Sequence, residues 1–227
     1  MRPIVPLERQ TESLLQAEQH WLAAQQGTRR KIENWTIAIS RLAGTPGTEV
    51  GEELGRRLGW PVYDRQLIQQ IASELGLHEK LLESVDEKQK NWLLERVETF
   101  AAAPRVSEAG FVRKLVETIL SLGTHGHCII VGRASWYVLP AASTLRVRLV
   151  GALPDRIERA EQTLHYTKKQ AAQWVEETDS ARQQFFKNHF FQDPADPSLY
   201  DLTLNTSRWN VGQCADIILQ GLRDLKD

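Results

Sequence analysis

The chain has 227 residues, of which 41% are hydrophobic and 25% charged, and this composition excludes a largely disordered protein. A formal net charge of -1 gives no overall attraction to nucleic acid or to an anionic membrane, so any phosphate site must come from a local cluster. Two distant cysteines, Cys128 and Cys214, and the absence of a signal-peptide core or long apolar run predict a cytoplasmic protein without disulfides, structural zinc or a membrane partner.

The first predicted element is an N-terminal helix over residues 6–26. Five apolar side chains lie at roughly the spacing of one helical face: Leu7, Leu14, Leu15, Trp21 and Leu22. Gly27 and the basic residues 28–31 predict the end of this helix and a linker. We therefore expect a helical extension over residues 1–33, packed on the main domain or on another subunit. The main domain would then span residues 34–227.

Five apolar runs separated by helical patterns predict an α/β domain with a mainly parallel sheet and helices on both faces. The predicted strands are residues 35–39, 61–63, 128–131, 145–150 and 202–205. The first and third runs are apolar without alternation, so we place both in the interior of the sheet. Ligands of such sheets bind at the carboxyl ends of the strands, where chemistry is therefore expected.

Helical patterns fill the connections between these strands. One helix is predicted from Val50 to Leu58, and another begins after Asp64, whose side chain can cap it. Residues 78–122 are mainly helical in pattern, with a break at residues 103–105.

The loop after the first strand has a composition that can hold phosphate: Ser40-Arg41-Leu42-Ala43-Gly44-Thr45-Pro46-Gly47-Thr48. Backbone N–H groups of such a loop can point at a phosphate, and the following helix adds its partial positive charge. We align Thr48 with the last residue of the standard motif G-x-x-x-x-G-K-[ST]. Arg41 then stands at the first glycine and Gly47 at the lysine. A phosphate loop and a plain turn between strand and helix both remain open.

Four short motifs occur in one strand-and-helix frame. They are Ser40-Arg41 with its glycine-rich turn, Pro61-Val62-Tyr63-Asp64-Arg65, Ile130-Val131-Gly132-Arg133, and Asp196-Pro197-Ser198-Leu199-Tyr200-Asp201-Leu202 before Asn205-Thr206-Ser207. Together they resemble the cytidylate-kinase-like family over about residues 35–225. The resemblance implies a P-loop kinase-like, three-layer fold. It also implies transfer of the γ-phosphoryl group of ATP, with Mg²⁺, to a nucleoside monophosphate or another small acceptor.

The resemblance assigns the donor phosphates to residues of the loop: Ser40, Arg41, Gly44, Thr45, Gly47 and Thr48. Thr48, at the start of the helix, can cap it or ligate Mg²⁺. Arg41 can replace the charge of the missing lysine or pair with a carboxylate such as Glu49.

On the acceptor side, Asp64 and Arg65 match positions that contact the acceptor in nucleoside monophosphate kinases. Arg133 matches an arginine near the acceptor phosphate. A helix cap for Asp64 and a solvated side chain for Arg133 are the open alternatives. The next residue is Ala134, where cytidylate kinases have an Asp near the reacting groups.

Residues 155–191 match the helical lid of the family, whose arginines close over the phosphates. Arg156 and Arg159 share a helical face, as do Asp179 and Arg182. Arginine clamps offset the charge of a loose phosphoryl-transfer transition state. Arg133 and the three lid arginines are therefore the expected clamp, with Asp179 orienting Arg182.

Two further patterns have both a functional and a structural interpretation. The aromatic residues within 185–191 can stack a base, but their spacing favours a packing face. His125 and His127 can ligate a metal, but no third ligand is nearby in sequence, which favours histidines of a turn.

A second functional hypothesis comes from the departures from the family pattern. The missing lysine and Ala134 favour a non-catalytic nucleotide-binding or regulatory module that kept the fold and lost the chemistry. The retained arginines oppose it.

Overall fold

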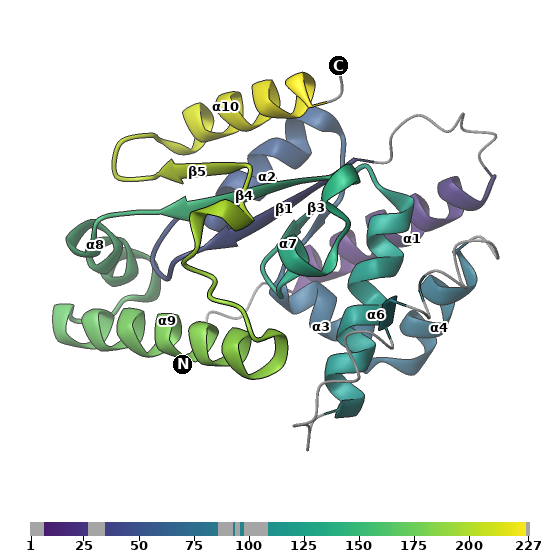
Figure 1. The fold of residues 1–227 in the computed structure, drawn as a ribbon, viewed down its shortest axis with the longest axis horizontal. Coiled ribbons are helices and arrows are strands. Elements are labelled where there is room, and N and C mark those ends of the chain that lie inside the picture. The colour runs from purple at the N-terminus through teal and green to yellow at the C-terminus, as the bar shows by residue number, and fades with distance from the viewer. Residues whose placement is uncertain (1–6, 27–34, 86–92, 94–95, 98–108, 226–227) are drawn as a thin grey trace.

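The computed structural model describes residues 7–26, 35–85, 93, 96–97 and 109–225. Its centre is a five-stranded parallel sheet with the strand order β2-β3-β1-β4-β5 (Figure 1). The strands are β1 (Thr36–Arg41), β2 (Val62–Tyr63), β3 (Cys128–Val131), β4 (Thr144–Val150) and β5 (Leu202–Asn205). Both β1 and β3 pair with a strand on each side, so the predicted parallel sheet with these two strands inside is confirmed.

Helices cover both faces of the sheet and complete the predicted three layers. They are α1 (Leu7–Gln26), α2 (Gly47–Leu58), α3 (Arg65–Ser73), α4 (Leu75–Glu83), α6 (Ala109–His125), α7 (Ser135–Val138), α8 (Leu153–Leu164), α9 (Lys168–Phe190) and α10 (Val211–Asp224), with 3-10 turns at Ala141–Ser143 and Pro197–Leu199. In Figure 1, α2 and α10 lie over one face and α3, α6 and α7 over the other, while α8 and α9 lie beyond the carboxyl ends of the central strands. The predicted linker at residues 28–31 and the break at 103–105 lie outside the described residues.

Alternation along the central strands separates the two halves of the core. Successive side chains of a strand point to opposite faces of the sheet. Ile37 and Ile39 therefore pack with Leu54 of α2 and Ile218 of α10, whereas Ala38 joins the core on the side of α3 and α6. Because both faces are covered, every residue of β3 is buried, which explains why its sequence shows no polar alternation.

The N-terminal helix α1 packs on the core through one stripe of small and aromatic residues. Ala17 and Trp21, four residues apart, are buried, and the indole Nε1 of Trp21 donates to the hydroxyl of Tyr63 at 3.1 Å. Leu15 and Leu22 of the predicted apolar face instead lie on the outer side, each more than half exposed. None of the helices in the described ranges combines the length and apolar character needed to cross a membrane.

The aromatic residues at the end of α9 form a packing face rather than an open platform. Phe186 stacks on Trp136 of α7 with 4.6 Å between ring centroids, and Phe190 lies 5.0 Å from Phe186. Both phenylalanines are buried, whereas Phe191 is 64% exposed. The carboxyl-terminal end of α9 is therefore anchored in the core, and its stacked rings already have protein partners.

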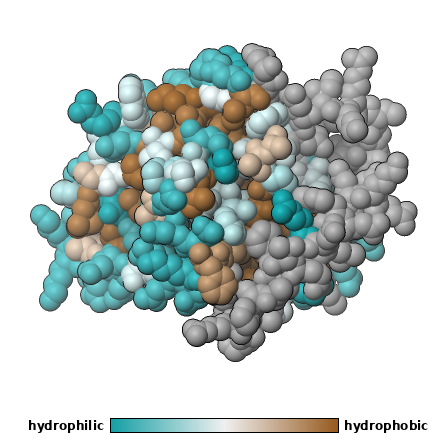
Figure 2. Space-filling view, viewed as in Figure 1, coloured by the Kyte–Doolittle hydropathy of each residue, from teal (hydrophilic) through white to brown (hydrophobic). Residues whose placement is uncertain are grey.

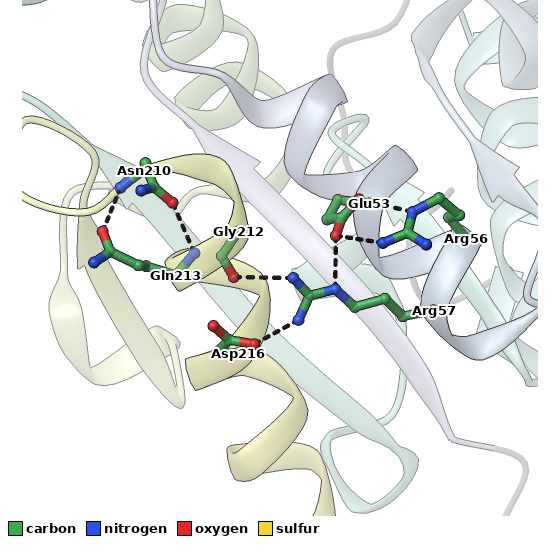
Figure 3. Close-up of polar contacts among 7 residues, drawn as sticks. All are labelled: Glu53, Arg56, Arg57, Asn210, Gly212, Gln213 and Asp216. Carbon is green, nitrogen blue, oxygen red and sulfur yellow. Dashed lines mark hydrogen bonds and ion pairs between the residues drawn. The ribbon is translucent and has the colours of Figure 1, made fainter.

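The carboxyl-terminal half of α2 is joined to α10 by polar contacts (Figure 3). Arg57 donates to Glu53 on its own helix and to Asp216 of α10, at 2.7 and 2.5 Å. Hydrogen bonds from Arg56 and Arg57 lower the pKa of Glu53 to about 2. Such exposed pairs contribute little to stability. They join α10 to the carboxyl-terminal half of α2 and leave the amino terminus of α2 without a partner from α10 in this set of contacts.

His125 is the last residue of α6 and is buried, whereas His127 follows in a turn with φ of 47°. The hydroxyl of Ser84 donates to the carbonyl of Leu81, so the Nε2–H of His125 must be the donor to Ser84, 2.8 Å away. Burial, with a smaller contribution from His20, lowers the pKa of His125 to about 4. The neutral ring is thus part of the folded core.

We expect the protein to lose stability as the pH falls from about 6.5 to 4. The unfolded chain binds a proton on His125 near pH 6.5, whereas the folded chain resists it down to about pH 4, so protonation favours unfolding by up to about 3 kcal/mol. Urea midpoints at pH 7 and pH 5 measure this difference. His125→Gln should flatten this dependence, whereas His165→Asn at an exposed position should leave it unchanged; an equal slope in both variants would contradict the assignment.

Candidate functional site

The loop between β1 and α2 folds tightly against α8 and α9, the two helices expected to form a lid. Gly44 has φ of 79°, and a Cβ there would collide with the backbone carbonyl of Arg156. The hydroxyl of Thr45 donates to the carbonyl of Leu42 at 2.8 Å, and the N–H of Gly47 donates to the carbonyl of Thr45 at 2.9 Å. Gly44 is therefore required both for its backbone conformation and for the close approach of α8.

Helix α2 begins at Gly47, three residues before the predicted start at Val50. The prediction placed the start of the helix at its first apolar residue, Val50. The helix begins earlier because the N–H of Val50 already donates to the carbonyl of Pro46 at 3.0 Å, which closes the first turn. Pro46 is the N-cap and makes no side-chain capping bond. No side chain caps the amino terminus of α2, where Thr48 lies, and such a helix end favours an anion.

Arg41 runs across this loop toward the end of β3. A Cβ on Gly47 would lie 2.9 Å from Cδ of Arg41, and a Cβ on Gly132 would collide with its Nη1. The expected alternative, a pair between Arg41 and Glu49, is wrong, since Glu49 pairs with Arg159 at 2.5 Å. The guanidinium of Arg41 therefore lies between the loop and the carboxyl end of β3.

Three other arginines surround Arg41, and we call Arg41, Arg65, Arg133 and Arg182 the arginine cluster. Burial, then the positive charge of Arg182, and further those of Arg65 and Arg133, lower the pKa of Arg41 to about 9, while Asp64 opposes the change. The guanidinium stays charged at neutral pH. Gathering like charges in a partly buried place is unfavourable unless an anion joins them.

Asp64 serves both as a helix cap and as a charge beside Arg41. Its carboxylate accepts from the N–H groups of Gln66 and Leu67 at 2.9 and 2.8 Å, so the predicted cap of α3 is confirmed. The negative charge of the same carboxylate offsets part of the lowering of the pKa of Arg41. Arg65 follows as the first residue of α3.

The backbone turns sharply where β3 ends. Gly132, Arg133 and Ala134 all have positive φ, of 85°, 57° and 59°. Left-handed conformations of residues other than glycine are strained and collect at functional sites. Arg133 donates to Oε1 of Gln69 on α3 at 2.7 Å, so its side chain contacts protein instead of being solvated alone.

The lid residues hold the backbone of the loop. One oxygen of Asp179 accepts from the N–H of Ala43 at 2.7 Å, and the other accepts from Nη1 of Arg156 at 2.6 Å. Arg156 also donates to the carbonyls of Ala43 and Gly151, each at 3.0 Å. Arg182 lies 3.9 Å from Asp179 and donates to the carbonyl of Arg41 at 2.9 Å. Asp179 thus binds Arg156 and the loop more closely than its expected partner.

The lid and the loop also share a small apolar core. Ala43 is buried with Ala160 of α8 and with Ala171 and Val175 of α9. Figure 2 shows mainly hydrophilic residues on the outer surface of α9. The two lid helices therefore turn their apolar side toward each other and toward the loop.

A third contact joins the loop to the segment before β5. The hydroxyl of Tyr200 lies 3.3 Å from Oγ of Ser40, accepts from Arg148 at 3.0 Å and donates to the carbonyl of Pro194 at 2.9 Å. Burial raises the pKa of Tyr200. Ser40 is thereby fixed at the carboxyl end of β1.

Four residues of this site were not among the predicted ones: Ala43, Gln69, Gly132 and Tyr200. Gly132 and Tyr200 lie within recognised motifs, so those motifs carried a signal for them. Ala43 contributes its backbone N–H and carbonyl, and Gln69 accepts a hydrogen bond from Arg133. No sequence pattern indicates either contact.

Residues that could hold a divalent cation are few. Within the described ranges, no group of three or more His, Cys, Asp or Glu side chains gathers as a metal site. Thr48 stands in the first turn of α2, partly buried. Mg²⁺ commonly binds through one or two protein ligands plus phosphates and water. The hydroxyl of Thr48 could be one such protein ligand, with the remaining ligands supplied by phosphates and water.

Comparisons with known proteins agree with this geometry. A family model described as the cytidylate kinase-like family matches residues 36–208. The cytidylate kinase of Methanopyrus kandleri is 26% identical over 192 residues, covering 80% of this chain and 90% of the relative. That of Pyrococcus horikoshii is 26% identical over 176 residues, covering 77% and 81%. A crystal structure of an uncharacterized protein from Eubacterium ventriosum superposes with a TM-score of 0.69 at 18% identity, covering 85% of this chain and 99% of that one.

Proposed function

Because the chain belongs to the cytidylate kinase-like family, we propose that it transfers the γ-phosphoryl group of ATP to a nucleoside monophosphate or another small acceptor. The observation that carries this proposal is the arginine cluster at the carboxyl ends of β1 and β3. It lies beside a glycine-containing loop and the uncapped amino terminus of α2. Asp64 and Asp179 offset only part of the charge of these four cations, so the cluster favours an anionic ligand, and a phosphoryl group in transfer is such a ligand.

In this proposal ATP binds on the side of the site formed by the loop and α2. Gly44 gives the loop its left-handed turn, and the first turn of α2 places the N–H of Thr48 beside the loop. Thr45 closes the loop through its hydroxyl, and Ser40 is fixed by Tyr200. In this proposal these residues orient the donor phosphates with backbone groups, while Arg41 adds positive charge.

Mg²⁺ would supply charge neutralisation between the β- and γ-phosphates when bound. Thr48 is the residue of the loop that could contribute a ligand, and phosphate oxygens and water would complete the shell.

On the acceptor side, we assign Asp64, Arg65 and Arg133 to binding and orienting the acceptor. An oxygen of the acceptor attacks the γ-phosphorus, the bond from the γ-phosphorus to the oxygen shared with the β-phosphate breaks, and ADP leaves with that oxygen. A hydroxyl acceptor releases its proton to water. Arg182 and Arg133 stabilise the charge on the transferring group, because arginine forks match phosphate oxygens. Arg156, Arg159 and Asp179 contribute by closing α8 and α9 on the loop.

A non-catalytic nucleotide-binding module is the second candidate. Ala134 favours it, since no carboxylate stands where cytidylate kinases have an Asp. The arrangement of Arg133 and Ala134 in strained backbone opposes it, because a binding module that had lost its chemistry would not need that strain.

Titration of the protein with ATP, followed by a phosphoryl-transfer assay against nucleoside monophosphates and small hydroxyl acceptors, tests the two candidates. We expect binding and turnover with at least one acceptor, and weaker binding at higher salt because the site is partly exposed. Binding without turnover on the whole panel would select the module, and absence of binding would overturn both.

A further inference from the structure

Two glycines leave open the space that the side chain of Arg41 occupies. Its Cβ, Cγ and Cδ lie 3.2, 3.0 and 2.9 Å from where a Cβ of Gly47 would stand. A Cβ on Gly132 would collide with its Nη1 and would lie 3.1 Å from its Cζ. Gly47 therefore faces the stem of Arg41, and Gly132 faces its guanidinium.

Gly47 stands where the standard phosphate loop has a lysine. In the standard phosphate loop this position carries the lysine that reaches the β- and γ-phosphates. Here the cation comes instead from Arg41, at the other end of the loop, and its stem crosses the Cα from which the lysine would have started. A lysine at position 47 and an arginine at position 41 could not both occupy this space.

We propose that these two positions have exchanged roles: Arg41 supplies the cation that contacts the donor phosphates, and Gly47 and Gly132 are positioning residues whose missing side chains admit it. This inference rests on the proposed function and deepens it by naming how the donor site is built.

The surroundings of Arg41 explain why the cation is an arginine. The groups that face it are Arg182 from α9, Arg65 from α3, Arg133 after β3 and Asp64 before α3. Burial together with these charges lowers the pKa of Arg41 to about 9, which leaves it charged at neutral pH. The same surroundings would also lower the pKa of a lysine, whose ordinary pKa is already below that of arginine. An arginine therefore keeps its charge here more readily than a lysine would.

A double-mutant cycle tests whether Gly47 acts through Arg41. Affinities for pyrophosphate and for ATP would be measured by isothermal titration for the wild type, Arg41→Ala, Gly47→Ala and the double variant. Arg41→Ala removes a charged partner, so we expect a loss of about tenfold to a hundredfold. Gly47→Ala should also weaken binding about tenfold in the wild type, but should change it less than twofold when Arg41 is already absent.

Gly76→Ala is the matched control, because a Cβ on Gly76 of α4 meets nothing within 4 Å. Its affinities should equal those of the wild type. Thermal melting of every variant shows that the fold is intact. If the effects of Arg41→Ala and Gly47→Ala multiply in the double variant, Gly47 acts independently and the exchange is wrong.

A pH profile separates a charge role from a packing role. Arg41→Lys should bind pyrophosphate nearly as well as the wild type at pH 6. The ratio of the affinity of Arg41→Lys to that of the wild type should then fall as the pH rises to 8.5, because the lysine loses its proton before the arginine does. Taking the ratio cancels the titration of pyrophosphate itself. A ratio that does not change with pH would overturn the inference. A wild type that binds neither probe would overturn the proposed function as well, which distinguishes the two failures.

Discussion

Replacing Arg182 with Ala is expected to lower turnover by about a hundredfold to a thousandfold, as for a donor that stabilises charge in the transition state. Arg182 comes from α9 and donates to the carbonyl of Arg41, which places its guanidinium at the loop. Burial lowers its pKa, as does the charge of Arg65, while Asp179 raises it. Its side chain is 36% exposed, so the lost hydrogen bond should cost only about 1 kcal/mol of stability.

Steady-state kinetics and thermal melting of the same samples separate these two effects. Lys187→Ala, at an exposed position on the same helix, is the matched control and should leave both unchanged. A fall of kcat with little change in KM would indicate action in the transition state. If stability falls as severely as turnover does, Arg182 is a structural residue.

Asp179→Ala is expected to weaken ATP binding and turnover together, each by about tenfold or more. The substitution removes the acceptor of the Ala43 N–H and of Arg156 at once, and each charged hydrogen bond lost is worth about 2 kcal/mol. The loop should lose its observed conformation, and α8 should be held less firmly against it. Nucleotide titration and kinetics would measure this, with denaturant unfolding to record the loss of stability.

Two variants bracket that result. Asp179→Asn keeps a carbonyl oxygen that can accept from Ala43, so it should fall between the wild type and Asp179→Ala. Glu176→Ala removes an exposed carboxylate from the same helix and should have no effect. Wild-type ATP affinity in Asp179→Ala would show that the lid contact does not shape the loop.

Patterns that depend on local chemistry were predictable from the sequence. The uninterrupted apolar run at Cys128–Val131 became a central strand because both its faces are covered. Asp64 capped α3 because a carboxylate before a helix accepts its free N–H groups. The start of α2 was predicted too late, since Gly47 and Thr48 carry no apolar signal for the first turn.

Contacts between distant segments were not predictable in the same way. The spacing of Asp179 and Arg182 suggested a pair, yet Asp179 lies closer to Arg156 and to a backbone N–H 136 residues away. The course of Arg41 depends on the absence of side chains at Gly47 and Gly132. A glycine in a sequence does not show which neighbour fills its space.

The hydrogen bond from Ala43 to Asp179 can report on the movement expected of α8 and α9. A backbone amide proton exchanges with solvent deuterium only when its bond opens. The amide of Ala43 is buried against α8 and α9 and donates to Asp179 of α9, so its exchange rate would report any opening of α9 away from the loop. One isotope-exchange signal in the whole protein would therefore test whether α8 and α9 open as a lid, without any label placed on those helices.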